Sequence, residues 1–130
     1  MTDNQQTTCT VIKDGSRIYR SSQGGLRPLL SWLADDPDLL KDSYVIDKVV
    51  GKASALLLAY GGVARVHGQT MSRTGADVLD AHGIEYSYDA LVDHVLNKDR
   101  TDMCPMEKKV AAIDDPAQAY AALAALIMHH

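Results

Sequence analysis

The sequence contains few of the residues that mark disulfide-bonded, metal-binding or membrane-spanning proteins. Phenylalanine is absent, there is one tryptophan, and the two cysteines, Cys9 and Cys104, lack the spacing of a zinc motif. No apolar run approaches the roughly 20 residues that span a bilayer, and the polar start MTDNQQTT is unlike a signal peptide. We therefore expect reduced thiols, a cytoplasmic location, and no cofactor, metal or membrane partner.

Positive charge is also scarce. The 13 Lys and Arg residues face 17 Asp and Glu, so the net charge is −4 and the pI is about 5.6. Such a chain lacks the basic footprint of a nucleic-acid binder, so we expect no nucleic-acid partner. Its 130 residues, 46% hydrophobic and 23% charged, have the composition of one soluble domain. We expect that domain at residues 8–130, after a disordered tail at residues 1–7.

The most informative stretch is YVIDKVVGKASALLLAYGG, from Tyr44 to Gly62. Its β-branched first part predicts a buried strand that ends at Gly51. From Lys52 onwards, alanine and leucine recur at helical spacing, which predicts a helix buried on most sides. The pair Gly61-Gly62 is a strong stop for this helix. A helix N-terminus that begins with a lysine therefore follows directly on a strand.

This junction predicts an anion-binding site. The first N–H groups of a helix are unpaired and carry partial positive charge, Gly51 permits close backbone approach, and Lys52 adds a full charge. Together they suit a phosphate or a carboxylate. Because lysine is unfavourable at this end of a helix, Lys52 is also a candidate nucleophile. Two plainer interpretations of Lys52 stay open: its side chain points to solvent, or it pairs with Asp47. If Asp47 does not pair with Lys52, we expect it to face the pocket at this junction.

The remaining periodicity predicts alternating strands and helices. Asp14-Gly15 indicates a hairpin, Ser72 a helix N-cap, and Pro105 the first turn of a helix. The predicted strands are Thr8 to Lys13, Arg17 to Arg20, Tyr44 to Val50, Val63 to His67, and Ile84 to Tyr88. Besides the helix from Lys52, the predicted helices are Leu26 to Ala34, Ser72 to Gly83, Ala90 to Asn97, and a last one from Pro116, with Gly68 to Met71 as a loop.

This order predicts an α/β fold. Strands that alternate with single helices favour right-handed crossovers and a mostly parallel sheet, and the opening hairpin makes the sheet mixed. We expect about five strands with helices on both faces, which is a three-layer αβα sandwich. Ligands of such sheets bind at the carboxyl ends of the strands, so residues 47–52 and 67–72 are predicted to share one rim.

Three motifs carry a resemblance to a known family. They are VIDKVVGKASALLLAYGGVARVHG (Val45–Gly68), LDAHGIEYSYDALVDHVLNKD (Leu79–Asp99) and TDMCPME (Thr101–Glu107). The chain from Val11 to Met106 resembles a small family of unknown function with a cytidine-deaminase-like fold. The resemblance implies that fold and a site at the helix N-terminus, and it leaves the reaction open.

The motifs depart from those of working deaminases. A zinc deaminase needs a His or Cys ligand with a Glu two residues later on one helix, and C-x-x-C on the next. The first helix here opens Gly51-Lys52-Ala53-Ser54 and the second Thr70-Met71-Ser72-Arg73, so neither supplies a ligand. Zinc-dependent deamination is therefore disfavoured. The resemblance instead implies a pocket without metal, in which Ser54, Ser72 and Arg73 supply hydrogen-bond donors beside Lys52.

Cys104 is a second candidate for chemistry. It stands at a predicted helix N-terminus with Lys108 and Lys109 one turn later, where a thiolate would be stabilised. Such a cysteine can act as a nucleophile or as a redox sensor. The plainer interpretation is a packed apolar residue, because cysteine is among the most buried residue types.

Three hypotheses for function follow. The first is a module that binds a nucleotide or sugar phosphate through Lys52, with Gly51, Ser54, Ser72 and Arg73 around the ligand. The second is an enzyme that uses Lys52 or Cys104 for covalent chemistry on a nucleotide or ribosyl substrate, with Asp47 as proton shuttle. The third is a scaffold with a vestigial pocket, whose apolar last helix, AQAYAALAALIM, packs against a second copy in a homodimer.

Overall fold

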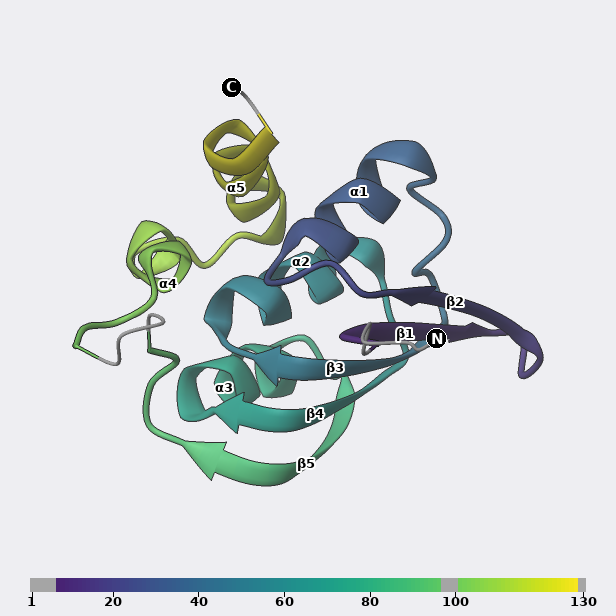
Figure 1. Cartoon of the computed structure of the whole chain (residues 1–130), viewed down its shortest axis with the longest axis horizontal. Helices are drawn as coiled ribbons and strands as arrows, with labels where there is room; N and C mark the ends of the chain where they lie inside the picture. The colour runs from purple at the N-terminus through teal and green to yellow at the C-terminus, as the bar shows by residue number, and fades with distance from the viewer. Residues whose placement is uncertain (1–6, 97–100, 129–130) are drawn as a thin grey trace, which may run out of the picture.

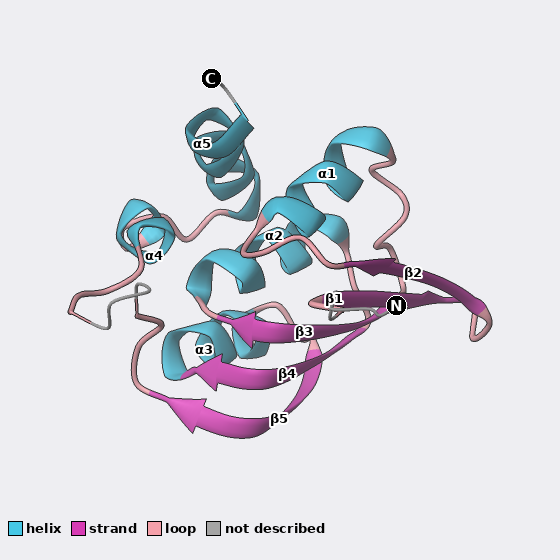
Figure 2. Cartoon of the chain, viewed as in Figure 1, coloured by secondary structure: helices cyan, strands magenta, loops and turns pink. Residues whose placement is uncertain are grey.

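The structure, a computed structural model, describes residues 7–96 and 101–128. Figure 2 shows the strands and helices. The strands are β1 (Cys9–Lys13), β2 (Arg17–Ser21), β3 (Tyr44–Val50), β4 (Arg65–Ser72) and β5 (Glu85–Val92). The helices are α1 (Arg27–Asp35), α2 (Lys52–Gly61), α3 (Arg73–Ala81), α4 (Pro105–Val110) and α5 (Pro116–Met128).

The five strands form one mixed sheet in the order β2-β1-β3-β4-β5. The prediction of an α/β fold with a mixed, five-stranded sheet is therefore confirmed. β1 is antiparallel to both β2 and β3, whereas β3, β4 and β5 are parallel. The arrowheads of these three parallel strands point to the same end of the sheet, where α4 lies (Figure 1). β3 occupies the middle of the sheet, with two strands on either side.

The prediction of helices on both faces is wrong for the described residues. The connections β2-α1-β3, β3-α2-β4 and β4-α3-β5 each join parallel strands and each advance in the same direction across the sheet. Because such crossovers are right-handed, all three helices must lie on one face. The contacts of α2 with α1, α3, α4 and α5 agree. The described part of the chain leaves the other face without a helix, and we call this the open face.

The core lies between the sheet and α2. Along β3, Val45 and Asp47 are buried while Tyr44, Ile46 and Lys48 on the open face are not, as expected where only one face is covered. α5 packs on α2 and α1, so α2 is buried on nearly all sides. In the described part of the chain, no helix is long and apolar enough to cross a membrane.

Most predicted turns and caps are confirmed. Asp14 and Gly15 have positive φ angles of 56° and 77° in the β1–β2 hairpin, Gly62 ends α2 in the left-handed conformation, and Ser72 caps α3. Pro105 stands in the first turn of α4. These signals are local, so the sequence displays them directly. Residues 1–6 of the predicted disordered tail lie outside the described residues.

Two predictions about β4 and β5 are wrong. The expected loop from Gly68 to Met71 is the second half of β4. The expected helix from Ala90 is also wrong at its start, because residues 90–92 are the last three residues of β5. Met71 pairs with Leu91 in parallel register. The apolar residues after Ala90 have helical spacing, but the ladder with β4 supplies their backbone partners and overrides that local preference. Asn97 lies outside the described residues.

Candidate functional site

A cavity of about 410 Å³ lies at the carboxyl end of β3. The end of β3 and the start of α2 form its floor, and the segment before α1 forms one side. The chain that follows β5, together with the start of α4, closes it. Its lining residues are Thr8, Gly24, Gly25, Leu26, Asp47, Lys48, Val49, Gly51, Ala53, Ser54, Val95, Leu96, Cys104, Met106 and Glu107.

Asp47 is one of two buried carboxyl groups that line this cavity, and Glu107 is the other. The Asp47 side chain lies on the helix-covered face of β3, and the residue is 6% exposed. Burial raises the pKa of Asp47 to about 7, although hydrogen bonds from the backbone N–H groups of Lys48 and Val49 favour the ionised form. The Lys48 N–H donates to Asp47 Oδ1 over 2.8 Å. A carboxyl group with this pKa can either donate or accept a proton near neutral pH.

Cys9 lies opposite Asp47 in the β1–β3 ladder and is 1% exposed. Burial and the neighbouring Asp47 carboxylate both raise the pKa of the Cys9 thiol. The thiol therefore stays protonated and packs as a small apolar group. This agrees with its assignment to the core from sequence.

Glu107 occupies the helix terminus that the sequence predicts as an anion site. The N–H groups of Lys52 and Ala53 donate to Glu107 Oε1 and Oε2 over 2.8 and 2.7 Å. Glu107 comes from α4 and is 7% exposed. Its carboxylate thus satisfies the first two amides of α2 and complements the positive end of the helix dipole. The anion predicted for this position is supplied by the chain itself.

The ammonium group of Lys52 points away from the cavity. Lys52 Nζ donates to the carbonyl oxygen of Ala111 and to Asp114 Oδ1, both over 3.0 Å. The Lys52 side chain is 14% exposed and does not line the cavity, whereas Asp114 is 93% exposed. Of the two plainer interpretations, ion pairing is the one observed, but with Asp114 in place of Asp47.

The remaining predicted site residues separate into two groups. Ser54 and Cys104 line the same cavity as Asp47 and Gly51. Ser72 and Arg73 do not line it: the Ser72 hydroxyl accepts from the Gly75 N–H over 3.0 Å as the cap of α3. The exposed Arg73 pairs with Asp93 at 2.8 Å. The structure thus places Asp47, Gly51, Ser54 and Cys104 together.

Sequence reasoning missed the role of Glu107 and the walls contributed by Gly24, Gly25 and Val95. Glu107 was visible only as an acidic residue in the first turn of its own helix, where it would be assigned to that helix's dipole. Its true partners are 55 and 54 residues away in sequence. The signals that this segment mattered were the motif TDMCPME and the placement of Cys104 at a predicted helix N-terminus.

The comparisons decide the family. A family model described as a domain of unknown function, DUF1893, matches residues 1–127. The chain belongs to the DUF1893 family. The crystal structure of a DUF1893 family protein from Thermotoga maritima is similar, with a TM-score of 0.84 and 32% identity over 93% of this chain and 81% of that one. No curated protein matches this DUF1893 chain.

Metal-ligating side chains do not gather in the described part of this DUF1893 domain. Across residues 7–96 and 101–128, no three His, Cys, Asp or Glu side chains come close enough together to hold a metal ion. At the start of α2, the Glu107 carboxylate lies beside Gly51 and is engaged by the backbone amides of Lys52 and Ala53.

Replacing Gly51 by alanine should disrupt the cavity. An added Cβ would lie 2.5 Å from Glu107 Oε1 and 2.8 Å from Val95 Cγ2, so both side chains must move and the Glu107 hydrogen bonds weaken. We expect Gly51→Ala to lower the free energy of unfolding by about 2–4 kcal/mol in urea denaturation. Gly24→Ala, at the same cavity, meets no atom within 4 Å and should change stability by less than about 0.5 kcal/mol. Equal stability of the two variants would contradict the contact.

The raised pKa of Asp47 should make stability fall with rising pH. Between the ordinary pKa of 3.8 and the folded value of about 7, the folded state binds the extra proton. The contribution of Asp47 to stability is therefore largest below pH 4, falls as pH rises toward 7, and is constant above it, with a total loss of about 4 kcal/mol. Asp47→Asn should abolish this fall, measured as the urea midpoint from pH 4 to 8. Asp77→Asn, at an exposed position on α3, should leave it unchanged.

Proposed function

We propose that this DUF1893 domain binds a small molecule of nucleobase or nucleoside size in the cavity at the end of β3, with Asp47 as the recognising group. The observation that supports this is a buried carboxyl group, with a pKa of about 7, in the wall of a 410 Å³ cavity. A carboxyl group costs free energy when buried, and such a group in a cleft is typical of a binding or catalytic site.

The character of the cavity wall favours a flat ligand with a few hydrogen-bonding groups. Leu26, Val49 and Met106 supply apolar surface, while Asp47 and the Ser54 hydroxyl supply polar groups. Volumes of about 300–1,000 Å³ with such a mixture are typical of small-molecule sites. A nucleobase could stack between the apolar walls and present its edge to Asp47.

The fold supports the same class of ligand by analogy. The order of the first eight elements, β-β-α-β-α-β-α-β, resembles that of the cytidine-deaminase-like fold, whose members handle nucleotides, and the cavity lies at the start of α2, where the resemblance implies a site. A shared fold is evidence for site location rather than for reaction. A deaminase-like pocket that lacks the zinc ligands is therefore part of this proposal.

A phosphate anchored at Lys52 is the less favourable form of the hypothesis. Such a phosphate would have to displace the Glu107 carboxylate from the α2 amides and compete with Asp114 for the Lys52 ammonium group. Recognition of the base or nucleoside through Asp47 requires neither step. We therefore place the ligand's neutral, hydrogen-bonding part in the cavity and any phosphate toward solvent.

A second candidate function is covalent chemistry. Cys104 lines the same cavity as Asp47, so a thiol and a proton-exchanging carboxyl group face one space. In this form, the Cys104 sulfur adds to the carbon of a C=O or C=N bond of the ligand, the π bond breaks, and Asp47 transfers the thiol proton to the oxygen or nitrogen. Cys104 is half-buried, whereas Cys9 is 1% exposed.

Calorimetric titration with nucleobases, nucleosides and their 5′-phosphates tests the binding proposal. A nucleoside should bind at least as tightly as its phosphate, and Asp47→Asn should weaken binding at least about tenfold. As pH rises through 7, affinity should increase for a ligand that donates a hydrogen bond to Asp47. It should decrease for a ligand that accepts a hydrogen bond from Asp47. Asp77→Asn should bind normally. No binding by any of these compounds, or full binding by Asp47→Asn, would refute the proposal.

Intact-mass measurement with peptide mapping tests the covalent candidate. Iodoacetamide should label Cys104 in the native chain and leave the buried Cys9 unlabelled, and a ligand bound in the cavity should slow that labelling. A mass excess on Cys104 in protein purified from cells would identify the electrophile. If the wild type shows no adduct and Cys104→Ser binds the ligand as tightly as the wild type, the covalent candidate is refuted. Binding through Asp47 is then the remaining proposal.

A further inference from the structure

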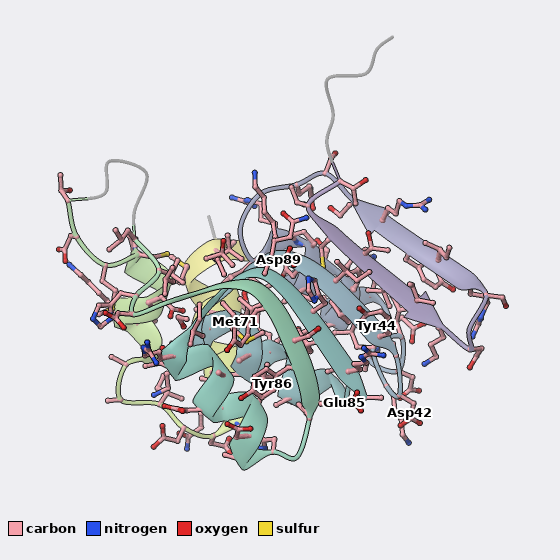
Figure 3. The ribbon with its side chains drawn as sticks, turned by 90° about the horizontal axis from the view of Figure 1, so that it is seen from below. Asp42, Tyr44, Met71, Glu85, Tyr86 and Asp89 are labelled. Carbon is pink, nitrogen blue, oxygen red and sulfur yellow. The ribbon has the colours of Figure 1, made fainter. Side chains whose placement is uncertain are left out.

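Three side chains that can transfer a proton meet on the open face of the sheet. Ser87 and Asp89 stand two residues apart on β5 and so lie on the same face, and the β4–β5 register places His67 directly opposite Ser87 (Figure 3). His67 Nδ1 lies 2.7 Å from Ser87 Oγ, and His67 Nε2 lies 3.2 Å from Asp89 Oδ1. One imidazole ring thus bridges a hydroxyl group and a carboxylate.

The Asp89 carboxylate determines which ring nitrogen is free to act as a base. Neutral imidazole carries one proton, and a carboxylate can only accept hydrogen bonds. Because Asp89 lies beside Nε2, the favoured tautomer of His67 holds its proton there and turns the lone pair of Nδ1 toward Ser87. The Ser87 hydroxyl group therefore donates to Nδ1. This sequence of hydroxyl, imidazole and carboxylate is the one that activates serine in hydrolases, where it is recognised by geometry and roles.

The cluster is accessible from the side on which a substrate would arrive. In the described part of the chain, no helix covers this face of the sheet. Ser87 is half-buried, and the side chains of His67 and Asp89 are 23% and 67% exposed. The imidazole ring is thus held among its neighbours while the Ser87 hydroxyl group keeps contact with solvent.

Two neighbours of this cluster suit an ester. The β3–β4 register places the half-buried Ile46 beside His67, in the same row as Ser87, where it offers an apolar surface to an acyl group. The exposed Gln69 follows His67 by two residues on β4 and is a diagonal neighbour of Ser87. Strand spacing and rise per residue put diagonal neighbours about 8 Å apart, which a long side chain can span. The Gln69 amide is therefore a donor for negative charge on a carbonyl oxygen.

We propose that Ser87, His67 and Asp89 form a hydrolytic site in which small carboxylic esters acylate Ser87. Ser87 Oγ adds to the carbonyl carbon while its proton passes to His67 Nδ1. The C–O bond to the alcohol then breaks, and the alcohol leaves with that proton. Water repeats both steps: its oxygen adds to the acyl carbon, His67 takes its proton, and the acid leaves as Ser87 Oγ regains a proton. Ester and water thus give acid and alcohol, with no other reactant.

This site is separate from the cavity at the end of β3. Asp47 lies on the helix-covered face of the sheet, whereas Ser87, His67 and Asp89 lie on the open face, and none of these three lines the cavity. The hydrolytic site therefore stands or falls independently of any ligand that binds beside Asp47.

Labelling of the full chain with an alkyl fluorophosphonate, followed by peptide mapping, tests the proposal. Ser87 Oγ should bond to phosphorus as fluoride leaves, so the adduct should lie on the peptide that contains Ser87. Ser87→Ala should abolish the adduct, and His67→Asn should slow its formation at least about 100-fold, because general-base catalysis contributes that much or more. The matched controls Ser16→Ala and His82→Asn, at exposed positions, should be labelled as the wild type is.

Turnover of p-nitrophenyl acetate tests the role of Asp89 as a positioning residue. Asp89→Asn should lower kcat about fivefold and leave KM unchanged, because an exposed carboxylate stabilises the protonated ring only modestly and does not touch the substrate. Asp89→Glu, which restores the charge, should recover most of that loss. Asp77→Asn, at an exposed position on α3, is the matched control. A kcat that Asp89→Asn leaves unchanged would remove Asp89 from the site.

Three results would overturn the hydrolytic site itself. The first is a wild type that gains no adduct, or gains it on a residue other than Ser87. The second is an His67→Asn variant that is labelled as fast as the wild type. The third is a Ser87→Ala variant that hydrolyses the ester at the wild-type rate. Circular dichroism and the Tm should show that each variant is folded. Any of these results would leave the three side chains as a hydrogen-bonded bridge between β4 and β5.

Discussion

The carboxylate of Glu107 on the first two amides of α2 is the contact on which the rest of the site depends. It joins α4 to the strand–helix junction, and thereby brings Cys104 and Met106 to the cavity that Asp47 and Ser54 line. It also explains Gly51, because any side chain there would overlap with Glu107. The Glu107 carboxylate thus caps the N-terminus of α2, requires glycine at position 51 and holds α4 as a wall of the cavity.

The same contact reverses the electrostatic character expected of the site. A bare helix terminus with a lysine would attract anions. With Glu107 on the amides and Asp114 on the lysine, the positive groups of the junction are already engaged. The cavity instead presents two carboxyl groups, and burial raises the pKa of one of them, Asp47, to about 7. Its selectivity should therefore depend on hydrogen bonding more than on charge attraction.

The sequence allowed prediction of those features that a few neighbouring residues determine. The hairpin at Asp14-Gly15, the Ser72 cap and the β3–α2 junction depend on local backbone geometry, and each could be identified directly. Asp47 was placed near the site because strand ends meet at one edge of a parallel sheet. Features decided by distant partners could not be predicted, among them the extension of β5 and the partners of Lys52 and Glu107.

The distance along the chain between α2 and Glu107 has a consequence for how the protein matures. The three parallel strands and their helices are complete before residue 93, and their contacts are between neighbours in sequence. The Lys52 and Ala53 amides at the N-terminus of α2 cannot receive the Glu107 carboxylate until α4 has been synthesised and has docked. Local contacts form early and long loops close late. A chain emerging from the ribosome therefore builds its sheet first and encloses its cavity last, so that only a nearly finished molecule has a complete cavity.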